Sequence, residues 1–416
     1  MEKIIVAHPG RQHSFRLATA LKKNDMLYKY ITTVYDKKSS FLMRLAKKII
    51  NSDNLKRANG RKCVALNDDD VLQFSELRGF IELILIRIDK SKRVYDWWNR
   101  RTADVFGKKV ANYAIKNNVD IVIMYDSAAY KCFEILKNRA PHIKRIMDSS
   151  IANRLYIKEI YENEIKNTGN NSYFYENKYM WNERIMKKFL DEIKNTEYFL
   201  VPSKFVKDSY VFSGVNENNI FMVPYGVNIS NSKIKKRNYS NKTLKFLFVG
   251  QVIARKGIDY LLEAFSEIDD LNIELNIVGS IGKDFEFIKN NKYKNIKVWG
   301  LVTHDKMKDI YNECDIFVFP SLAEGMTLSG LEAMGCGLPV ICTHNSGISD
   351  IIIDGENGFL IPTSDSEAIR KKILWFLKNK DKINKMRVCA YETALKYTWE
   401  EYEKNIISEI EKIINL

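Results

Sequence analysis

The chain has 416 residues, of which 45% are hydrophobic and 28% are charged. This length exceeds what one hydrophobic core usually serves, and the composition is ordinary for a globular protein, so we expect two folded domains. The formal net charge is +14, and residues 1–62 hold 15 Lys or Arg against 4 Asp or Glu, which indicates an anionic partner for the first domain. No apolar run reaches the roughly 18 residues that a membrane span needs, and we expect a cytoplasmic protein. Six cysteines without a CxxC pair are expected to be reduced and mostly buried.

Short β-rich runs alternate with longer helical stretches, which predicts an α/β protein with parallel sheets covered by helices. The expected strands of the first half are 4–7, 121–124, 145–148, 199–201 and 221–223. Those of the second half are 246–249, 275–278, 297–299, 316–319 and 340–342. Because 228–243 is polar and lacks apolar periodicity, we predict a first domain at 1–227, a linker at 228–243, a second domain at 244–397, and a C-terminal helix at 398–416 that crosses back to the first domain.

The basic charge of the first domain has two interpretations. Residues 41–50 (FLMRLAKKII) put apolar side chains on one helical side and Arg44, Lys47 and Lys48 on another. Such a helix lies on anionic lipid, or it packs on a core with a solvated lysine face. Nucleic acid is the weaker candidate, because no zinc spacing or aromatic RNA-binding motif accompanies the charge.

Two further segments have a chemical or structural interpretation. A second basic helical region, 87–109, carries Trp97 and Trp98, whose place in a core or at an interface stays open. The acidic run 68–70 precedes an apolar run, so we interpret it as helix N-terminal charge and expect no metal site.

The most informative segment is 319–341, FPSLAEGMTLSGLEAMGCGLPVI. A strand ends there, a loop carries Glu324 and Gly325, and a short helix follows. The amides of 325–328 then lie at a helix N-terminus, which favours phosphate through free donors and the positive end of the macrodipole. Glu332 lies about two turns further on, roughly 10 Å along the axis, so the two carboxylates are expected to contact different parts of one ligand.

A second cluster lies at 248–257, FVGQVIARKG, where a strand gives way to a loop with adjacent Arg255 and Lys256. Two fixed cations at this edge would neutralise a diphosphate leaving group. An Arg-Lys pair alone is usually a solvated surface feature, but its place ahead of the Glu324 loop favours the functional interpretation.

Two strand ends of the first half carry the remaining candidates. At 7–14 (AHPGRQHS) a strand leads through a Gly10 turn into a helix that we expect Ser14 to cap, with His8, Arg11 and His13 as candidates for sugar or phosphate contacts. At 145–153 (RIMDSSIAN) the strand ends in polar side chains that suit an acceptor hydroxyl: Asp148 as base or orienter, with Ser149 beside it.

With these residues in hand, the chain resembles the family 4 glycosyltransferases, which are retaining enzymes of the GT-B fold. The likeness covers about 244–400 through VGQVIARKGIDYLLEAF, VWGLV, the 319–341 segment, DGENGFLI and YTW. Glu324 and Glu332 match the Glu-x7-Glu motif of that family. In the first half the likeness is looser and rests on the Gly10 loop, the 145–153 edge and VPSKF at 201–205.

The resemblance implies two Rossmann-like domains and a nucleotide diphosphate sugar, UDP- or GDP-linked, as donor, without a metal or other cofactor. It implies that Glu324 holds hydroxyls of the donor sugar, that Glu332 binds the ribose, and that Arg255 and Lys256 bind the diphosphate. It further implies binding contacts from several other residues: the nearby backbone at Gly325, Met326, Thr327 and Leu328, the nucleobase neighbours Leu301 and Val302, and the Gly10 loop. The chain departs from the family in having Gln251, where an arginine is frequent, and one glycine in the first loop instead of two.

The implied reaction transfers the sugar with retention, with the departing phosphate deprotonating the acceptor. The acceptor expected from this likeness is a glycan or a polyprenyl-diphosphate-linked glycan of a bacterial envelope, at the inner face of the cell membrane. The alternatives are a nucleotide-sugar epimerase of related fold and a catalytically idle, membrane-associated binding partner. A Rossmann oxidoreductase comes last, because the GxGxxG fingerprint and the acidic ribose binder are missing.

Overall fold

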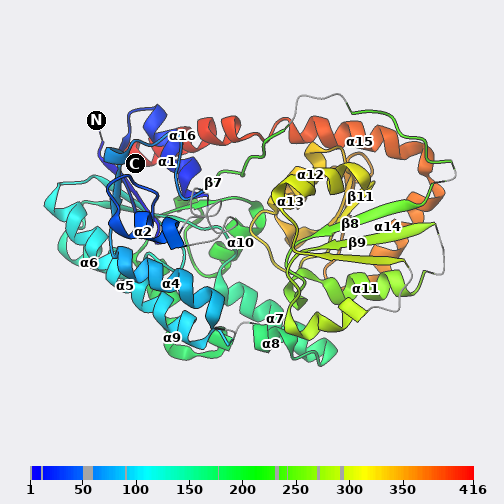
Figure 1. Cartoon of the computed structure of the whole chain (residues 1–416), viewed down its shortest axis with the longest axis horizontal. Helices are drawn as coiled ribbons and strands as arrows, with labels where there is room; N and C mark the ends of the chain where they lie inside the picture. The colour runs from blue at the N-terminus through cyan, green and yellow to red at the C-terminus, as the bar shows by residue number, and fades with distance from the viewer. Residues whose placement is uncertain are drawn as a thin grey trace.

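Two parallel β-sheets, each covered by helices on both faces, form two lobes that lie side by side in the computed structural model (Figure 1). The structure describes residues 2–10, 13–49, 60–89, 91–176, 178–229, 234–240, 242–268, 272–290 and 295–416. Within these ranges the fold is α/β with two Rossmann-like domains, as the sequence predicts.

The sheet of the first lobe has the strand order β3-β2-β1-β4-β5-β6-β7, and all its neighbours pair in parallel. Its strands are β1 Ile4–Ala7, β2 Leu27–Thr32, β3 Val71–Gln73, β4 Ile121–Tyr125, β5 Lys144–Asp148, β6 Tyr198–Val201 and β7 Ile220–Met222. Its helices are α1 Ser14–Lys23, α2 Phe41–Ile49, α4 Glu76–Ile88, α5 Arg93–Lys116, α6 Tyr130–Arg139, α7 Arg154–Thr168, α8 Ser172–Glu176, α9 Glu183–Asn195 and α10 Lys204–Phe212.

The sheet of the second lobe has the strand order β10-β9-β8-β11-β12-β13, again parallel. Its strands are β8 Leu244–Val249, β9 Ile273–Val278, β10 Ile296–Gly300, β11 Ile316–Phe319, β12 Val340–Thr343 and β13 Gly358–Ile361. Its helices are α11 Ile258–Ser266, α12 His304–Glu313, α13 Leu328–Gly335, α14 Ser366–Lys378 and α15 Lys380–Ala394.

The final helix, α16 Trp399–Asn415, leaves the second lobe and packs along α1 of the first (Figure 1). The Lys23 ammonium pairs with Glu403 at 2.5 Å, and the Lys144 ammonium donates to the carbonyls of Ile413 and Ile414. The face of α16 toward the lobe is apolar and buried. The last helix therefore belongs to the core of the first lobe.

The structure corrects three local expectations. Ser14 does not cap α1; it is the first helical residue, and its hydroxyl hydrogen-bonds the Tyr30 hydroxyl at 2.9 Å. The acidic run Asp68–Asp70 forms a 3-10 turn before β3 and starts no α-helix. The region 87–109 is not one helix, because the Asp89 carboxylate accepts the backbone N–H groups of Ser91 and Tyr95 and starts α5 afresh.

The six cysteines are free thiols, and four of them are buried, as predicted. Across the described ranges, every helix is too short or too polar to traverse a lipid bilayer.

Candidate functional site

Each sheet reverses its strand order once, and the candidate residues lie at these two points. In the second sheet the reversal falls between β8 and β11, whose following loops carry Arg255 with Lys256 and Glu324. In the first sheet it falls between β1 and β4, and His8 directly follows β1. Ligands of open α/β sheets bind outside the carboxyl ends of the strands at such a point.

The loops after β8 and β11 meet in an ionic cluster that joins the three predicted catalytic residues. The Glu324 carboxylate contacts the Lys256 ammonium and lies 3.2 Å from the Arg255 guanidinium, which also donates to the Ala323 carbonyl at 2.6 Å. The backbone is fixed here as well, because Gly257 has a φ of +65°, and a Cβ on it would lie 2.0 Å from the Pro320 carbonyl oxygen. The two loops thus hold both cations and the carboxylate at one edge.

Lys256 is buried, with 8% of its surface exposed, and its ammonium lies 4.9 Å from the centre of the Phe319 ring. Burial, followed by the adjacent Arg255 guanidinium, lowers the pKa of Lys256 well below its ordinary value. A charged Lys256 therefore needs an anion in contact, and Glu324 is that anion here. A phosphate group beside Lys256 would compensate its charge in the same way.

The segment that follows Glu324 leads into the N-terminus of α13. Gly325, Met326 and Thr327 are buried, whereas Leu328, the first residue of the helix, is exposed. The first amides of a helix have no acceptor within it, and together with the macrodipole they favour an anion. Any side chain at Gly325 is excluded, because its Cβ would lie 1.8 Å from the Ser150 carbonyl oxygen of the first lobe.

Glu332 lies on α13 and accepts a hydrogen bond from the Tyr311 hydroxyl of α12 at 3.0 Å. Both residues line a cavity of about 250 Å³, together with Met307 and Leu328. This volume is close to the lower end of the range for small-molecule sites. The predicted nucleobase neighbours Leu301 and Val302 follow β10 at the same edge, although the cavity lining does not include them; Leu301 is exposed.

In the first lobe, two predicted acceptor-side residues form a buried pair. The His13 Nε2 atom lies 2.8 Å from the Asp148 carboxylate and 3.4 Å from the Tyr225 hydroxyl. Asp148 ends β5, and Tyr225 follows β7, so residues far apart in the sequence meet at one sheet edge. The sequence predicted each of the two strand ends as a candidate site, but it did not predict that His13 contacts Asp148.

His8 is buried beside this pair, and its Nδ1 atom accepts the backbone N–H of Gly10 at 2.8 Å. Burial lowers the pKa of His8 to about 4, which keeps the ring neutral at physiological pH. The Gly10 carbonyl accepts from the Thr32 hydroxyl, which ties the turn to β2. Arg11 lies outside the described residues.

The remaining acceptor-side candidate, Ser149, is completely buried and presents no accessible surface. Ser203 is a residue that the sequence analysis did not single out: its hydroxyl donates to the Gly325 carbonyl at 2.6 Å and so joins the two lobes. The signal was present, because Ser203 lies in the VPSKF segment.

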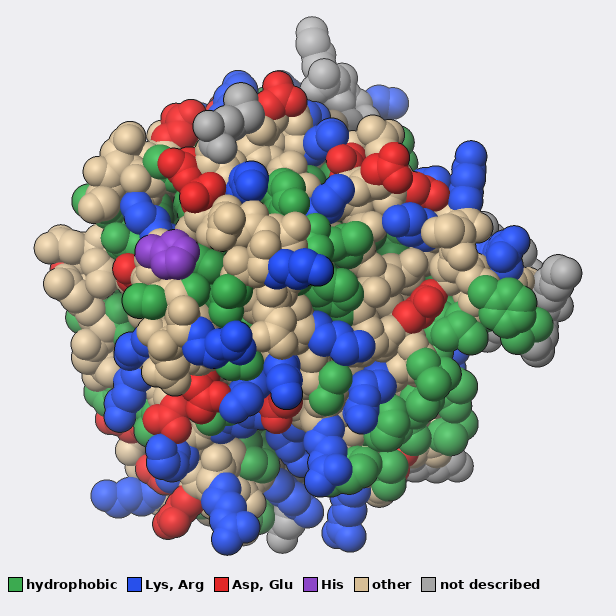
Figure 2. All heavy atoms as spheres, turned by 90° about the vertical axis from the view of Figure 1, so that its left-hand side faces the viewer, with side chains coloured by type: hydrophobic (Ala, Val, Ile, Leu, Met, Phe, Trp, Pro, Cys, Tyr) green, Lys and Arg blue, Asp and Glu red, His purple; other side chains and the backbone are tan. Residues whose placement is uncertain are grey.

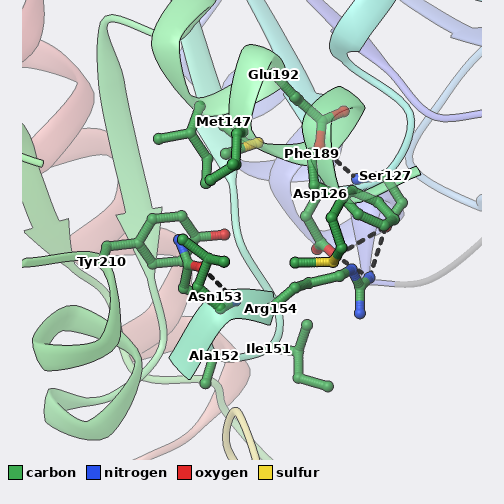
Figure 3. Close-up of a pocket in the computed structure, with 14 residues that line it drawn as sticks. Asp126, Ser127, Met147, Ile151, Ala152, Asn153, Arg154, Phe189, Glu192 and Tyr210 are labelled. Carbon is green, nitrogen blue, oxygen red and sulfur yellow. Dashed lines mark hydrogen bonds and ion pairs between the residues drawn. The ribbon is translucent and has the colours of Figure 1, made fainter. Parts of the chain in front are cut away.

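A separate polar cluster lies in the first lobe beneath α7 and α9 (Figure 3). The Arg154 guanidinium pairs with Asp126 at 3.3 Å and donates to the Ser127 hydroxyl at 2.6 Å. The buried Glu192 carboxylate accepts three backbone N–H groups at the start of α6. The enclosed volume is about 20 Å³, which is room for about one water, so this cluster fixes the loop after β4 rather than holding a sugar.

Comparison with known proteins finds a family likeness in the second lobe. Residues 230–393 match the model of the glycosyl transferases group 1 family. This matched segment, termed the group 1 domain, contains β8 to β13, Arg255, Lys256, Glu324 and Glu332, and therefore every residue of the ionic cluster.

Relatives of known sequence match only part of this chain, and the chain spans about half the length of these relatives. An uncharacterised glycosyltransferase of Methanocaldococcus jannaschii is 29% identical over 50% of this chain. The capsular polysaccharide biosynthesis glycosyltransferase CapM of Staphylococcus aureus is 29% identical over 35% of it. The matches span 57% and 40% of those two proteins.

The fold extends beyond this sequence likeness to both lobes. The structure of Anabaena HepE in complex with UDP-glucose aligns over 99% of this chain and 100% of its own, with a TM-score of 0.60 and 13% identity. Together with the two parallel sheets, this likeness establishes the GT-B fold.

Proposed function

We propose that the chain is a metal-independent glycosyltransferase that moves a sugar, with retention of configuration, from a nucleotide diphosphate sugar to a glycan or polyprenyl-diphosphate-linked acceptor. The observation that carries the proposal is the contact of Lys256 and Arg255 with Glu324 at the switch point of the group 1 domain. Met326 links this cluster to the first lobe, because its sulfur accepts the backbone N–H of Tyr225, whose hydroxyl reaches His13.

In the proposed donor complex the diphosphate binds Lys256, Arg255 and the first amides of α13. The negative charge of the diphosphate then compensates Lys256 in place of Glu324. The Glu324 carboxylate is thereby free to bind hydroxyls of the donor sugar. The ribose lies at Glu332, and the base lies toward Leu301 and Val302. UDP- and GDP-sugars are the expected donors, and the UDP-glucose complex of HepE supports the first of these.

In the reaction the bond between the anomeric carbon and the β-phosphate oxygen breaks, and its electron pair stays on that oxygen. The acceptor oxygen bonds to the same face of the carbon, and its proton passes to the departing phosphate. Lys256 and Arg255 stabilise the charge that develops on the leaving group. His13 and Asp148 orient the acceptor from the first lobe, so positioning and charge stabilisation supply the catalysis.

The acceptor is the less constrained half of the proposal. The likeness to CapM, named for capsular polysaccharide biosynthesis, supports a glycan of a bacterial envelope. We place the reaction on the cytoplasmic side of the cell membrane, where such a glycan grows on its lipid carrier.

Donor binding is tested by thermal unfolding with UDP-, GDP-, ADP- and CMP-sugars. A ligand that binds the folded state raises the melting temperature by mass action, so one nucleotide class should raise it by several degrees. The Lys256→Ala variant should lose this rise, whereas Lys371→Ala, at an exposed lysine of α14, should keep it. If no nucleotide sugar raises the melting temperature of the parent protein, the proposal is wrong.

Turnover assays separate the alternatives. With the donor that binds, we expect transfer to an acceptor at the same rate with and without EDTA. A new sugar epimer formed without acceptor would instead identify an epimerase. Donor binding without any chemistry across a panel of lipid-linked acceptors would favour an idle binding partner.

A further inference from the structure

Helix α4 has the apolar composition of a buried helix, yet most of its side chains are partly or fully exposed to solvent. Eight of its thirteen residues are large and apolar (ELRGFIELILIRI), yet Gly79 is the one buried residue among them, and all thirteen are described. Ile84, Ile86 and Ile88 each expose more than half of their surface. A helix that is apolar all round normally lies inside a core or against lipid.

Neighbouring helices extend this exposed apolar surface. The hydroxyl of Ser40, just before α2, contacts the carboxylate of Glu76 at the start of α4, so the two helices begin side by side. Phe41 of α2 is 66% exposed, and Trp97 of α5, which packs on α4, is 46% exposed. We call this surface the α4 patch: Phe41, Leu45, Ile84, Ile86, Ile88 and Trp97.

Positive charge borders the α4 patch. Arg44, Arg87, Lys92 and Arg93 are exposed, and residues 41–101 hold 14 Lys or Arg against 8 Asp or Glu. The face drawn in Figure 2 shows hydrophobic side chains gathered at the lower right, with lysine and arginine side chains beside them. The Arg101 guanidinium lies 4.5 Å from the Trp97 ring centre, which keeps a cation at the edge of the apolar area.

We propose that the α4 patch docks the protein on an anionic lipid bilayer, with α4 lying in the interface. Ile84 and Ile88, one turn apart on the same side of α4, would enter the acyl region, and Trp97 would take the headgroup level that tryptophan prefers. The bordering cations would meet lipid phosphates. A second copy of the chain fits less well, because a two-fold contact through the patch would bring Arg87, Lys92 and Arg93 against like charges.

This interaction is independent of sugar transfer, so its test needs no donor. The purified full-length protein is floated with neutral phosphatidylcholine vesicles and with vesicles containing 30% phosphatidylglycerol, at low and high salt. We expect flotation with the anionic vesicles, reduced at high salt because ionic contacts are screened. Equal binding to neutral vesicles, or no binding to either kind, would overturn the proposal.

Matched variants locate the contact. Ile84→Asp combined with Ile88→Asp should lower the bound fraction at least tenfold. Ile353→Asp, at an equally exposed isoleucine of the second lobe, should leave it unchanged. Lys92→Gln with Arg93→Gln should weaken binding and reduce its salt dependence.

Two further measurements exclude unfolding and damage to the second lobe as causes of weaker flotation. An unchanged melting temperature shows that each variant is folded, and an unchanged donor-induced shift shows that the group 1 domain is intact. If sedimentation instead revealed a dimer of the parent protein that Ile84→Asp with Ile88→Asp disrupts, the patch would belong to a second copy and the lipid proposal would fail.

Discussion

At the scale of single residues, the central feature is a buried lysine neutralised by the carboxylate that is proposed to hold the donor sugar. Loss of Glu324 leaves the Lys256 charge buried without its anion, which costs about 3–5 kcal/mol in such pairs. Loss of Lys256 costs less, because Glu324 keeps the Arg255 guanidinium at 3.2 Å. Loss of both partners removes that penalty. Stability and catalysis therefore respond differently to substitution at this pair.

This difference gives the first prediction. Glu324→Gln should destabilise the fold more than Lys256→Met, and the double variant should regain much of the stability that Glu324→Gln alone loses. Turnover should fall at least a hundredfold in all three, because removal of one preorganised electrostatic contact commonly costs 10²–10³ in kcat. Urea unfolding and the transfer assay check the two effects separately. Full turnover in either single variant would refute the assignment of these residues.

His8 makes stability depend on pH. Its pKa is lowered to about 4 in the folded protein mainly by burial, while the nearby Asp148 opposes the shift. An unfolded histidine, near 6.5, takes up a proton first as pH falls, so the folded state loses stability between about pH 6.5 and 4.

The loss attributable to His8 should be about 2 kcal/mol between pH 7 and pH 5. His8→Gln, whose side chain oxygen can still accept the Gly10 N–H, should show a correspondingly smaller loss. Urea unfolding at both pH values measures the difference. Identical losses in the two proteins would show that His8 is not responsible.

At the scale of elements, the sequence identified ten of the thirteen strands in the described part of the chain and missed β2, β3 and β13. The expected segments at 4–7 and 316–319 coincide with β1 and β11. Polar residues interrupt β2 (LYKYIT), and β3 has three residues, whereas β13 (GFLI) is apolar but short and begins with a glycine.

The ionic cluster was predictable, because Arg255, Lys256 and Glu324 all follow apolar strands, and parallel strands bring their carboxyl ends to one edge. The pairing of His13 with Asp148 was not, because 135 residues separate them and side-chain direction is set by packing. The Ser203 contact with Gly325 depends on how two lobes meet, about which local sequence says nothing.

At the scale of the whole molecule, several hydrogen bonds hold the lobes together. Ser203 bonds Gly325, the Lys204 backbone N–H donates to Asp350 at 2.7 Å, and the Tyr260 hydroxyl of α11 donates to Glu164 of α7 at 2.5 Å. Each of these contacts joins the first lobe to the second. The structure is thus an arrangement in which the donor loop already touches the acceptor lobe.

Gly325→Ala tests this arrangement. The added Cβ would meet the Ser150 carbonyl oxygen at 1.8 Å, so the lobes must separate. We expect a larger radius of gyration by small-angle scattering and at least tenfold lower turnover, with donor binding largely kept because the second lobe supplies it. Ser203→Ala removes a hydrogen bond without a clash and should have a smaller effect. An unchanged radius with normal turnover would show that this contact is dispensable.

The return of α16 to the first lobe bears on synthesis at the ribosome. Helix α1 is translated long before α16, so the apolar surface that α16 covers stays exposed until the second lobe has been synthesised. The second lobe has its own sheet and can fold while α1 is still uncovered. A nascent chain halted before Trp399 should therefore present a protease-sensitive, chaperone-binding first lobe beside a finished second one.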